Sequence, residues 1–88
     1  MIEREITVTN RLGLHARPSA MVVQTASKFK SEVKLKRKEL EINAKSIMGV
    51  MMLAAEMGSK IVILAEGEDE AQAVEAMAKL FEDKFGEE

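Results

Sequence analysis

Several residue types that often carry chemistry are absent from this chain or occur only once. Its 88 residues include no cysteine, tryptophan or tyrosine, a single histidine, His15, and a single proline, Pro18. Without cysteine there is no disulfide framework, and one histidine cannot supply the four nitrogen or sulfur ligands of a structural zinc site. Without tryptophan or tyrosine, an aromatic platform for nucleic-acid bases is not expected. We therefore expect neither a metal nor a cofactor.

The charge and hydropathy of the chain exclude further classes of protein. The formal net charge is −2 and the pI is about 5.5, whereas nucleic-acid binding needs a basic surface. No apolar run approaches the ~20 residues of a membrane span. Nothing resembles a signal peptide, and the usual glycine-rich nucleotide-binding motifs are absent. We expect a cytoplasmic protein that binds no nucleic acid and does not insert into a membrane.

The length predicts one small domain over residues 1–88, with a modest core and no deep active site, so that function should lie on the surface. Hydrophobic periodicity predicts seven elements. The strands are expected over residues 2–9, twice within 32–43 and over 60–66, and the helices over 16–29, 46–58 and 68–86. This βαββαβα order favours a two-layer α+β fold, with helices on one face of an antiparallel sheet.

The same patterns predict which side chains face the core. In the first strand, Ile2, Ile6 and Val8 share a face with Arg4. The other predicted core residues are Val33, Leu35, Leu40 and Ile42 in the two short strands, and Val74, Met77, Phe81 and Phe85 in the last helix. The unbroken apolar run of the fourth strand, Ile61 to Ala65, predicts an interior place in the sheet.

Helix-end signals accompany the second and third predicted helices. Ser46 is a suitable N-cap, and Gly58 is a suitable residue after a helix end. Asp69, followed three residues later by Gln72, predicts a capping box at the start of the last helix.

His15 directly precedes the first predicted helix, and Pro18 falls in its first turn, where a missing N–H costs little. A lone histidine is most often only a surface or partly packed residue. However, the free N–H groups of a helix N-terminus and the nearby Arg17 favour a neutral imidazole, which is a good nucleophile. They would also face a phosphoryl group taken up by that imidazole. The site therefore suits a phosphohistidine, and it does not suit acid–base hydrolysis.

Two segments carry a family resemblance. The stretch GLHARPSA at residues 13–20, together with KSIMGVMMLAA at 45–55, resembles the HPr family of phosphocarriers of the bacterial phosphoenolpyruvate-dependent sugar phosphotransferase system. The resemblance covers essentially the whole chain. It implies an open-faced β-sandwich in which three helices cover one face of a four-stranded antiparallel sheet.

The resemblance also implies an activity. It implies that His15 accepts a phosphoryl group on its δ1 nitrogen from phospho-enzyme I, that Arg17 neutralises this group, and that sugar-specific IIA proteins receive it. The chain would be a non-catalytic carrier, and we expect a monomer. Two alternatives stay open: a carrier of the nitrogen-related phosphotransferase branch, and a purely regulatory module acting through phospho-Ser46.

Ser46 has a second role in the family. In many relatives the matching serine is phosphorylated by an ATP-dependent HPr kinase/phosphorylase, and a transcriptional regulator is a further implied partner. Phosphorylation of Ser46 is compatible with its place as an N-cap, because a helix N-terminus accommodates a phosphate.

The segment after Ser46 is apolar nearly all round. Its methionines could form a Met-rich core or an exposed patch, where a flexible thioether suits several partners. The resemblance implies that enzyme I and IIA proteins dock on Ala16, Ala20, Ile47, Met48 and Met51. Gln24 stands where relatives often carry a basic residue.

Overall fold

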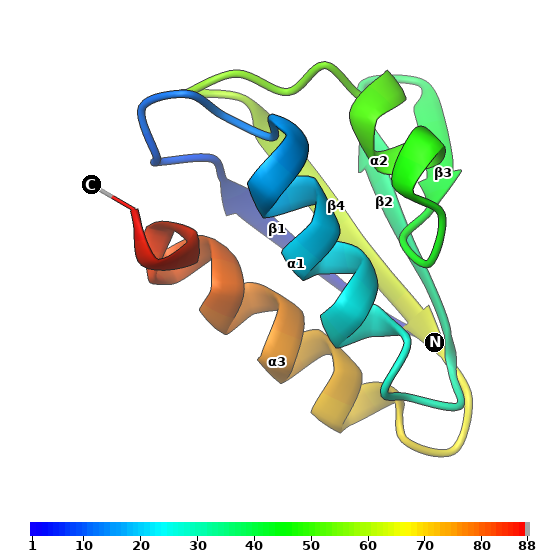
Figure 1. Ribbon diagram of the computed structural model, residues 1–88. Helices are drawn as coiled ribbons and strands as arrows, with labels where there is room; N and C mark the ends of the chain where they lie inside the picture. Colours follow the sequence, from blue (N-terminus) through cyan, green and yellow to red (C-terminus); the bar gives the residue numbers. More distant parts are fainter. Residues whose placement is uncertain (88) are drawn as a thin grey trace.

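The computed structural model describes residues 1–87 and contains the predicted order of elements (Figure 1). In chain order they are β1 (Ile2–Thr7), α1 (Ala16–Ala26), β2 (Glu32–Arg37), β3 (Leu40–Asn43), α2 (Ile47–Met52), β4 (Lys60–Glu66) and α3 (Glu70–Glu82), followed by the 3-10 turn η1 (Lys84–Gly86). None of the helices within residues 1–87 is long and apolar enough to cross a membrane.

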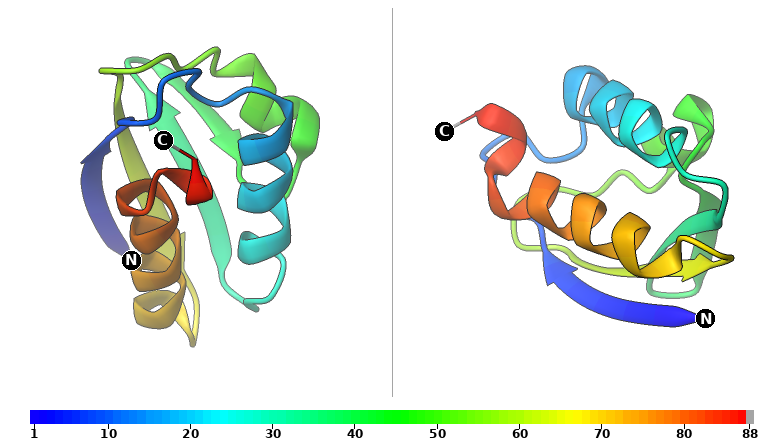
Figure 2. Two further views of the ribbon diagram at one scale, coloured as in Figure 1. Left: turned by 60° about the vertical axis from the view of Figure 1, so that its left-hand side comes forward. Right: turned by 90° about the horizontal axis from the view of Figure 1, so that it is seen from below.

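The four strands form one antiparallel sheet in the order β1-β4-β2-β3. The interior place predicted for residues 60–66 is confirmed, because β4 pairs with β1 on one side and β2 on the other. All three helices lie on the same face, with α3 over β1 and β4 and α2 beside β3, and the opposite face is bare (Figure 2). The fold is therefore the expected open-faced α+β sandwich.

The predicted core is largely confirmed. Fully buried side chains from β2, β4 and α3 meet between the layers, among them Val33, Leu35, Ile61, Ile63, Met77 and Phe81. Arg4 shares the helix-facing side of β1 and reaches Glu75 of α3, with Nη1 2.8 Å from the carboxylate. The prediction for Leu40 is wrong, since it is 41% exposed. Leu40 pairs with Arg37 at the hairpin end of the edge strand β3, where neighbouring side chains cover it incompletely.

All three helices are shorter than predicted, and α3 covers Glu70–Glu82 where residues 68–86 were predicted. The first ends at Ala26 and not at residue 29, and the second ends at Met52 and not at residue 58. Gly58 does not end α2. It lies in the following loop and donates its N–H to the Val8 carbonyl at 2.8 Å. The helix cannot continue through Ala54, whose φ of 48° lies in the left-handed region. The apolar pattern in the sequence continues past this point because Leu53 and Ala55, which lie in the loop, are buried in the core.

The predicted capping box of α3 is also wrong. Asp69 occupies the N-cap position, but its carboxylate makes no cap bond within α3. It instead accepts hydrogen bonds from the Ser31 hydroxyl and from the N–H groups of Lys30 and Ser31. The hydrogen bond from the Ser31 hydroxyl and those from the backbone lower the pKa of Asp69 to about 2. This contact fastens the connection between α1 and β2 to the start of α3.

Candidate functional site

His15 is the N-cap residue of α1. Its backbone is extended, with φ −79° and ψ −168°, and its side chain makes no cap hydrogen bond. The helix begins at Ala16 as predicted, and Arg17 is helical even though a proline follows it, a placement that normally disfavours helical geometry. Pro18 is buried in the first turn, where its missing N–H removes no helical bond.

The loop before His15 is fixed by close contact with the loop after α2. Gly13 has a φ of 68°, and a Cβ placed there would collide with the Ala55 carbonyl oxygen. The next residue, Leu14, donates its N–H to that same oxygen at 2.8 Å, and the buried Ser19 hydroxyl donates to the Leu14 carbonyl at 3.1 Å. The backbone that carries the imidazole is therefore held from both sides.

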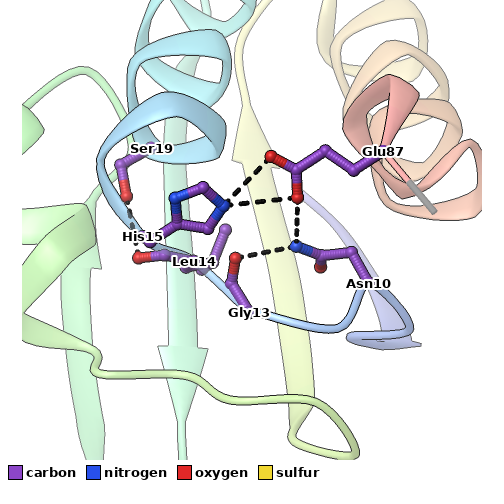
Figure 3. Close-up of polar contacts among 6 residues, drawn as sticks. All are labelled: Asn10, Gly13, Leu14, His15, Ser19 and Glu87. Carbon is purple, nitrogen blue, oxygen red and sulfur yellow. Dashed lines mark hydrogen bonds and ion pairs between the residues drawn. The ribbon is translucent and has the colours of Figure 1, made fainter.

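The imidazole of His15 contacts the carboxylate of Glu87 (Figure 3). Its Nε2 lies 3.0 Å from Glu87 Oε2 and 3.3 Å from Oε1. Asn10 joins the same cluster, because its Nδ2 donates to Glu87 Oε1 at 3.0 Å and to the Gly13 carbonyl at 2.8 Å. Within residues 1–87, Nδ1 of His15 has no hydrogen-bond partner and lies on the side of the ring away from Glu87.

Glu87 is ionised at neutral pH. Its partial burial raises the pKa. Hydrogen bonds from Asn10 and His15, the charge of Arg17 and that of His15 when its ring is protonated lower the pKa by more, so that the net shift is downward. Neither Glu87 nor Asn10 is predicted from the sequence as a residue of the site. They lie outside the motif at residues 13–20, and Glu87 reaches the site only because α3 returns to the N-terminal end of α1.

The first turn of α1 presents unpaired donors next to the imidazole. The first amide of the turn to bond back is that of Ser19, which donates to the His15 carbonyl at 3.0 Å. Pro18 has no N–H, and the N–H groups of Ala16 and Arg17 have no partner within residues 1–87. The Arg17 side chain is exposed. An anion bound at Nδ1 would thus meet two amides and a guanidinium at the positive end of the helix dipole.

Ser46 is the N-cap of α2, as predicted. Its backbone is extended, and its Oγ accepts a hydrogen bond from the Gly49 N–H at 3.1 Å. The residue is only partly buried, so the hydroxyl combines a structural contact with access from solvent.

The residues expected to dock partners come from two adjacent helices, since α1 packs directly beside α2 (Figure 1). Ala16 is exposed and Ala20 is half-buried. On α2, Ile47 is 41%, Met48 73% and Met51 47% exposed. A Met-rich core is therefore excluded for α2, whose contribution to the interior is Val50, followed by Leu53 just past its end. We refer to Ala16, Ala20, Ile47, Met48 and Met51 as the α1–α2 patch.

The bare face of the sheet contains a hollow of about 780 Å³ floored by Val62 and Leu64. This hollow is on the opposite side of the sheet from the helices and does not include His15. The His15 imidazole, 35% exposed, instead lies on the surface at a helix end. An exposed imidazole at a helix end beside an apolar patch suits a small protein that meets other proteins at its surface.

Comparison with known proteins identifies the family. Residues 2–83 match the family model described as the PTS HPr component phosphorylation site. The chain is 56% identical to the phosphocarrier protein HPr of Xylella fastidiosa, over 99% of this chain and 98% of the relative, and 49% identical to that of Treponema pallidum, over all of both. The crystal structure of HPr from Thermoanaerobacter tengcongensis superposes with a TM-score of 0.96 at 49% identity, covering 100% of this chain and 99% of the other. The chain belongs to the HPr family of phosphotransferase-system phosphocarriers.

Proposed function

We propose that this chain is a cytoplasmic phosphoryl carrier in which Nδ1 of His15 accepts the phosphoryl group of phospho-enzyme I and hands it to sugar-specific IIA proteins. The carrying observation is the placement of the imidazole at the uncapped N-terminus of α1, with Nε2 against Glu87 and Nδ1 unpartnered within residues 1–87. The chain itself catalyses no turnover, because each transfer needs a partner protein.

The surroundings of His15 support a phosphoryl group on Nδ1. The N–H groups of Ala16 and Arg17 are free to donate to phosphate oxygens within the described chain, and the Arg17 guanidinium can add a charge-assisted contact. These donors stabilise the bound group without enclosing it. A surface phosphoryl group can then be passed on to a second protein.

The α1–α2 patch is the proposed docking surface for enzyme I and the IIA proteins. It is apolar and lies on the two helices whose N-cap residues are His15 and Ser46. Phosphorylation of Ser46 by an HPr kinase/phosphorylase would place about −1.5 to −2 charges beside this patch. Ser46 is therefore proposed as a regulatory site that acts through docking.

The test is incubation of the purified chain with phosphoenolpyruvate and enzyme I. We expect one acid-labile phosphate per chain, mapped to His15 by mass spectrometry, and its transfer to an added IIA protein. A known HPr labelled in parallel serves as control. If that control is labelled and this chain is not, the proposed function is wrong.

A further inference from the structure

Glu87 lies far from His15 in the sequence but supplies the hydrogen-bond partner of its imidazole. The contact joins two partly covered side chains, since the His15 side chain is 35% and the Glu87 side chain 18% exposed. Asn10, whose side chain is fully buried, holds the same carboxylate through Oε1. The Glu87 carboxylate is thus held between Asn10 Nδ2 and His15 Nε2.

A left-handed turn after α3 brings Glu87 to the imidazole. After α3, Lys84 and Phe85 have φ values of 54° and 56°, which side chains other than glycine rarely adopt. The buried Phe85 ring compensates for this strain by packing edge-on against Phe81, with ring centroids 4.9 Å apart. The Glu87 N–H then donates to the Lys84 carbonyl at 2.8 Å. The turn therefore directs Glu87 back toward α1.

The contact decides which nitrogen of the neutral ring is the nucleophile. An ionised carboxylate only accepts hydrogen bonds, so the ring nitrogen facing it must carry the hydrogen. Nε2 is that nitrogen, and the neutral ring consequently keeps its lone pair on Nδ1. Nδ1 is also the nitrogen nearer the first turn of α1 in Figure 3.

We propose that Glu87 is a positioning residue for phosphoryl transfer, holding the hydrogen on Nε2 of His15 and facing the positive charge that the ring acquires when Nδ1 is phosphorylated. This inference rests on the proposed function. In the transfer, the Nδ1 lone pair forms the bond to phosphorus, and the bond from phosphorus to the donor breaks with its electron pair leaving on the donor atom. The ring retains its Nε2 hydrogen throughout, so its new positive charge lies opposite the Glu87 carboxylate.

Three variants separate this role from a structural one. Glu87→Ala removes both the acceptor and the charge, and Glu87→Gln keeps a carbonyl acceptor without the charge. Glu39→Gln, in the exposed turn between β2 and β3, makes the same change of net charge away from the site. Each variant is examined by nitrogen-15 NMR of the His15 ring and by the rate of labelling with phosphoenolpyruvate and enzyme I. Thermal unfolding of each is recorded in parallel.

We expect the wild-type ring to show a hydrogen-bonded Nε2–H proton that Glu87→Ala loses and Glu87→Gln retains. Labelling of Glu87→Ala should slow roughly three- to tenfold, a modest loss because the pair is partly exposed to solvent. Glu87→Gln should fall between it and the wild type, and Glu39→Gln should match the wild type. Unfolding temperatures should not follow this order.

Each contrary result has a definite meaning. A ring spectrum unchanged in Glu87→Ala overturns the contact, and an unchanged labelling rate overturns the positioning role. Equal slowing in Glu39→Gln assigns the effect to overall charge and also overturns it. If the wild type is not labelled at all, the proposed function is wrong, while the ring spectrum still decides whether Glu87 holds the Nε2 hydrogen.

Discussion

His15 and Ser46 stand at the same place in two helices. Each is the N-cap residue and each has an extended backbone. The Ser46 hydroxyl accepts a hydrogen bond from the Gly49 N–H, so the end of α2 is closed by its own cap. The His15 side chain turns away toward Glu87 and leaves the end of α1 open. The comparison shows that a side chain that does not cap its helix leaves amide donors free for a ligand.

The largest expected effect comes from removing the reactive group at the open helix end. His15→Ala should abolish acid-labile labelling by phosphoenolpyruvate and enzyme I, because no other side chain of this chain combines an imidazole with a helix N-terminus. The fold should remain, since His15 makes no cap bond. The measurement is the phosphate bound per chain, with circular dichroism as the control for folding. Normal labelling of the variant would remove His15 from the mechanism.

The next effect concerns Arg17, the charged residue beside the open end of α1. The first turn of α2 has no charged residue. Arg17→Ala should slow labelling roughly tenfold to a hundredfold, because one charge-assisted donor to the phosphoryl oxygens is lost. Arg17 is exposed, so stability should hardly change. The labelling rate checks this, with Arg11→Ala, an exposed arginine before the motif, as the matched control. Equal rates for wild type and Arg17→Ala would contradict it.

The surface that connects the two helix ends can be tested through Met48. Met48→Glu places a charge on a contact that loses its water on docking and should weaken binding to enzyme I by about 2 kcal/mol, or roughly thirtyfold. Stability should change much less, since the side chain is 73% exposed. Calorimetry gives the affinity and thermal unfolding gives the stability. The docking assignment fails if the variant binds like the wild type.

The closed helix end should respond differently to charge and to loss of the cap. Ser46→Asp adds a negative charge beside the α1–α2 patch and should slow labelling of His15 roughly three- to tenfold at low salt, with partial recovery at high salt. Ser46→Ala should leave labelling near normal and cost about 1 kcal/mol of stability, because the Gly49 N–H loses its acceptor. Labelling rates at two salt concentrations and chemical denaturation are the measurements. Equal low-salt rates for Ser46→Asp and wild type would leave Ser46 as a cap only.

A third helix start, at Asp69, should show the smallest effect and only through pH. Its pKa is lowered from 3.8 to about 2, so the native contacts with Ser31 and Lys30 favour the ionised form. A lowered carboxyl pKa contributes stability above pH 4, and this contribution is lost as the pH falls toward 2. Asp69→Asn should therefore be less stable than wild type at pH 7, with the difference shrinking toward pH 2. Denaturation at both pH values tests this, and a constant difference would contradict it.

The features that the sequence predicts correctly are those with a local signal. His15, Arg17 and Pro18 stand together at the start of one helix, and the apolar run at 61–65 marks the interior strand. Both features depend on residues within one or two turns of each other. They were therefore readable without knowing which distant segments meet.

The wrong predictions concern residues whose contacts lie in segments distant in the sequence. Asp69 has the spacing of a capping box, but its carboxylate bonds to a loop that is distant in sequence. Leu53 and Ala55 continue the apolar pattern of α2 from a loop, so the helix was predicted too long. Glu87 enters the site through a left-handed turn at Lys84 and Phe85, which no local motif announces.

The strand order has a consequence for how the chain folds during synthesis. The sheet is ordered β1-β4-β2-β3, so β4 is the interior strand that joins β1 to the β2–β3 pair. Ile2 pairs with Ala65, and Val33 pairs with that same residue from the other side. While a ribosome extends the chain, the β2–β3 hairpin is the one strand pair that can form from neighbouring segments. The loop carrying His15 contacts the loop that leads into β4, since the Leu14 N–H donates to the Ala55 carbonyl, so the surroundings of His15 take shape only after β4 has been synthesised.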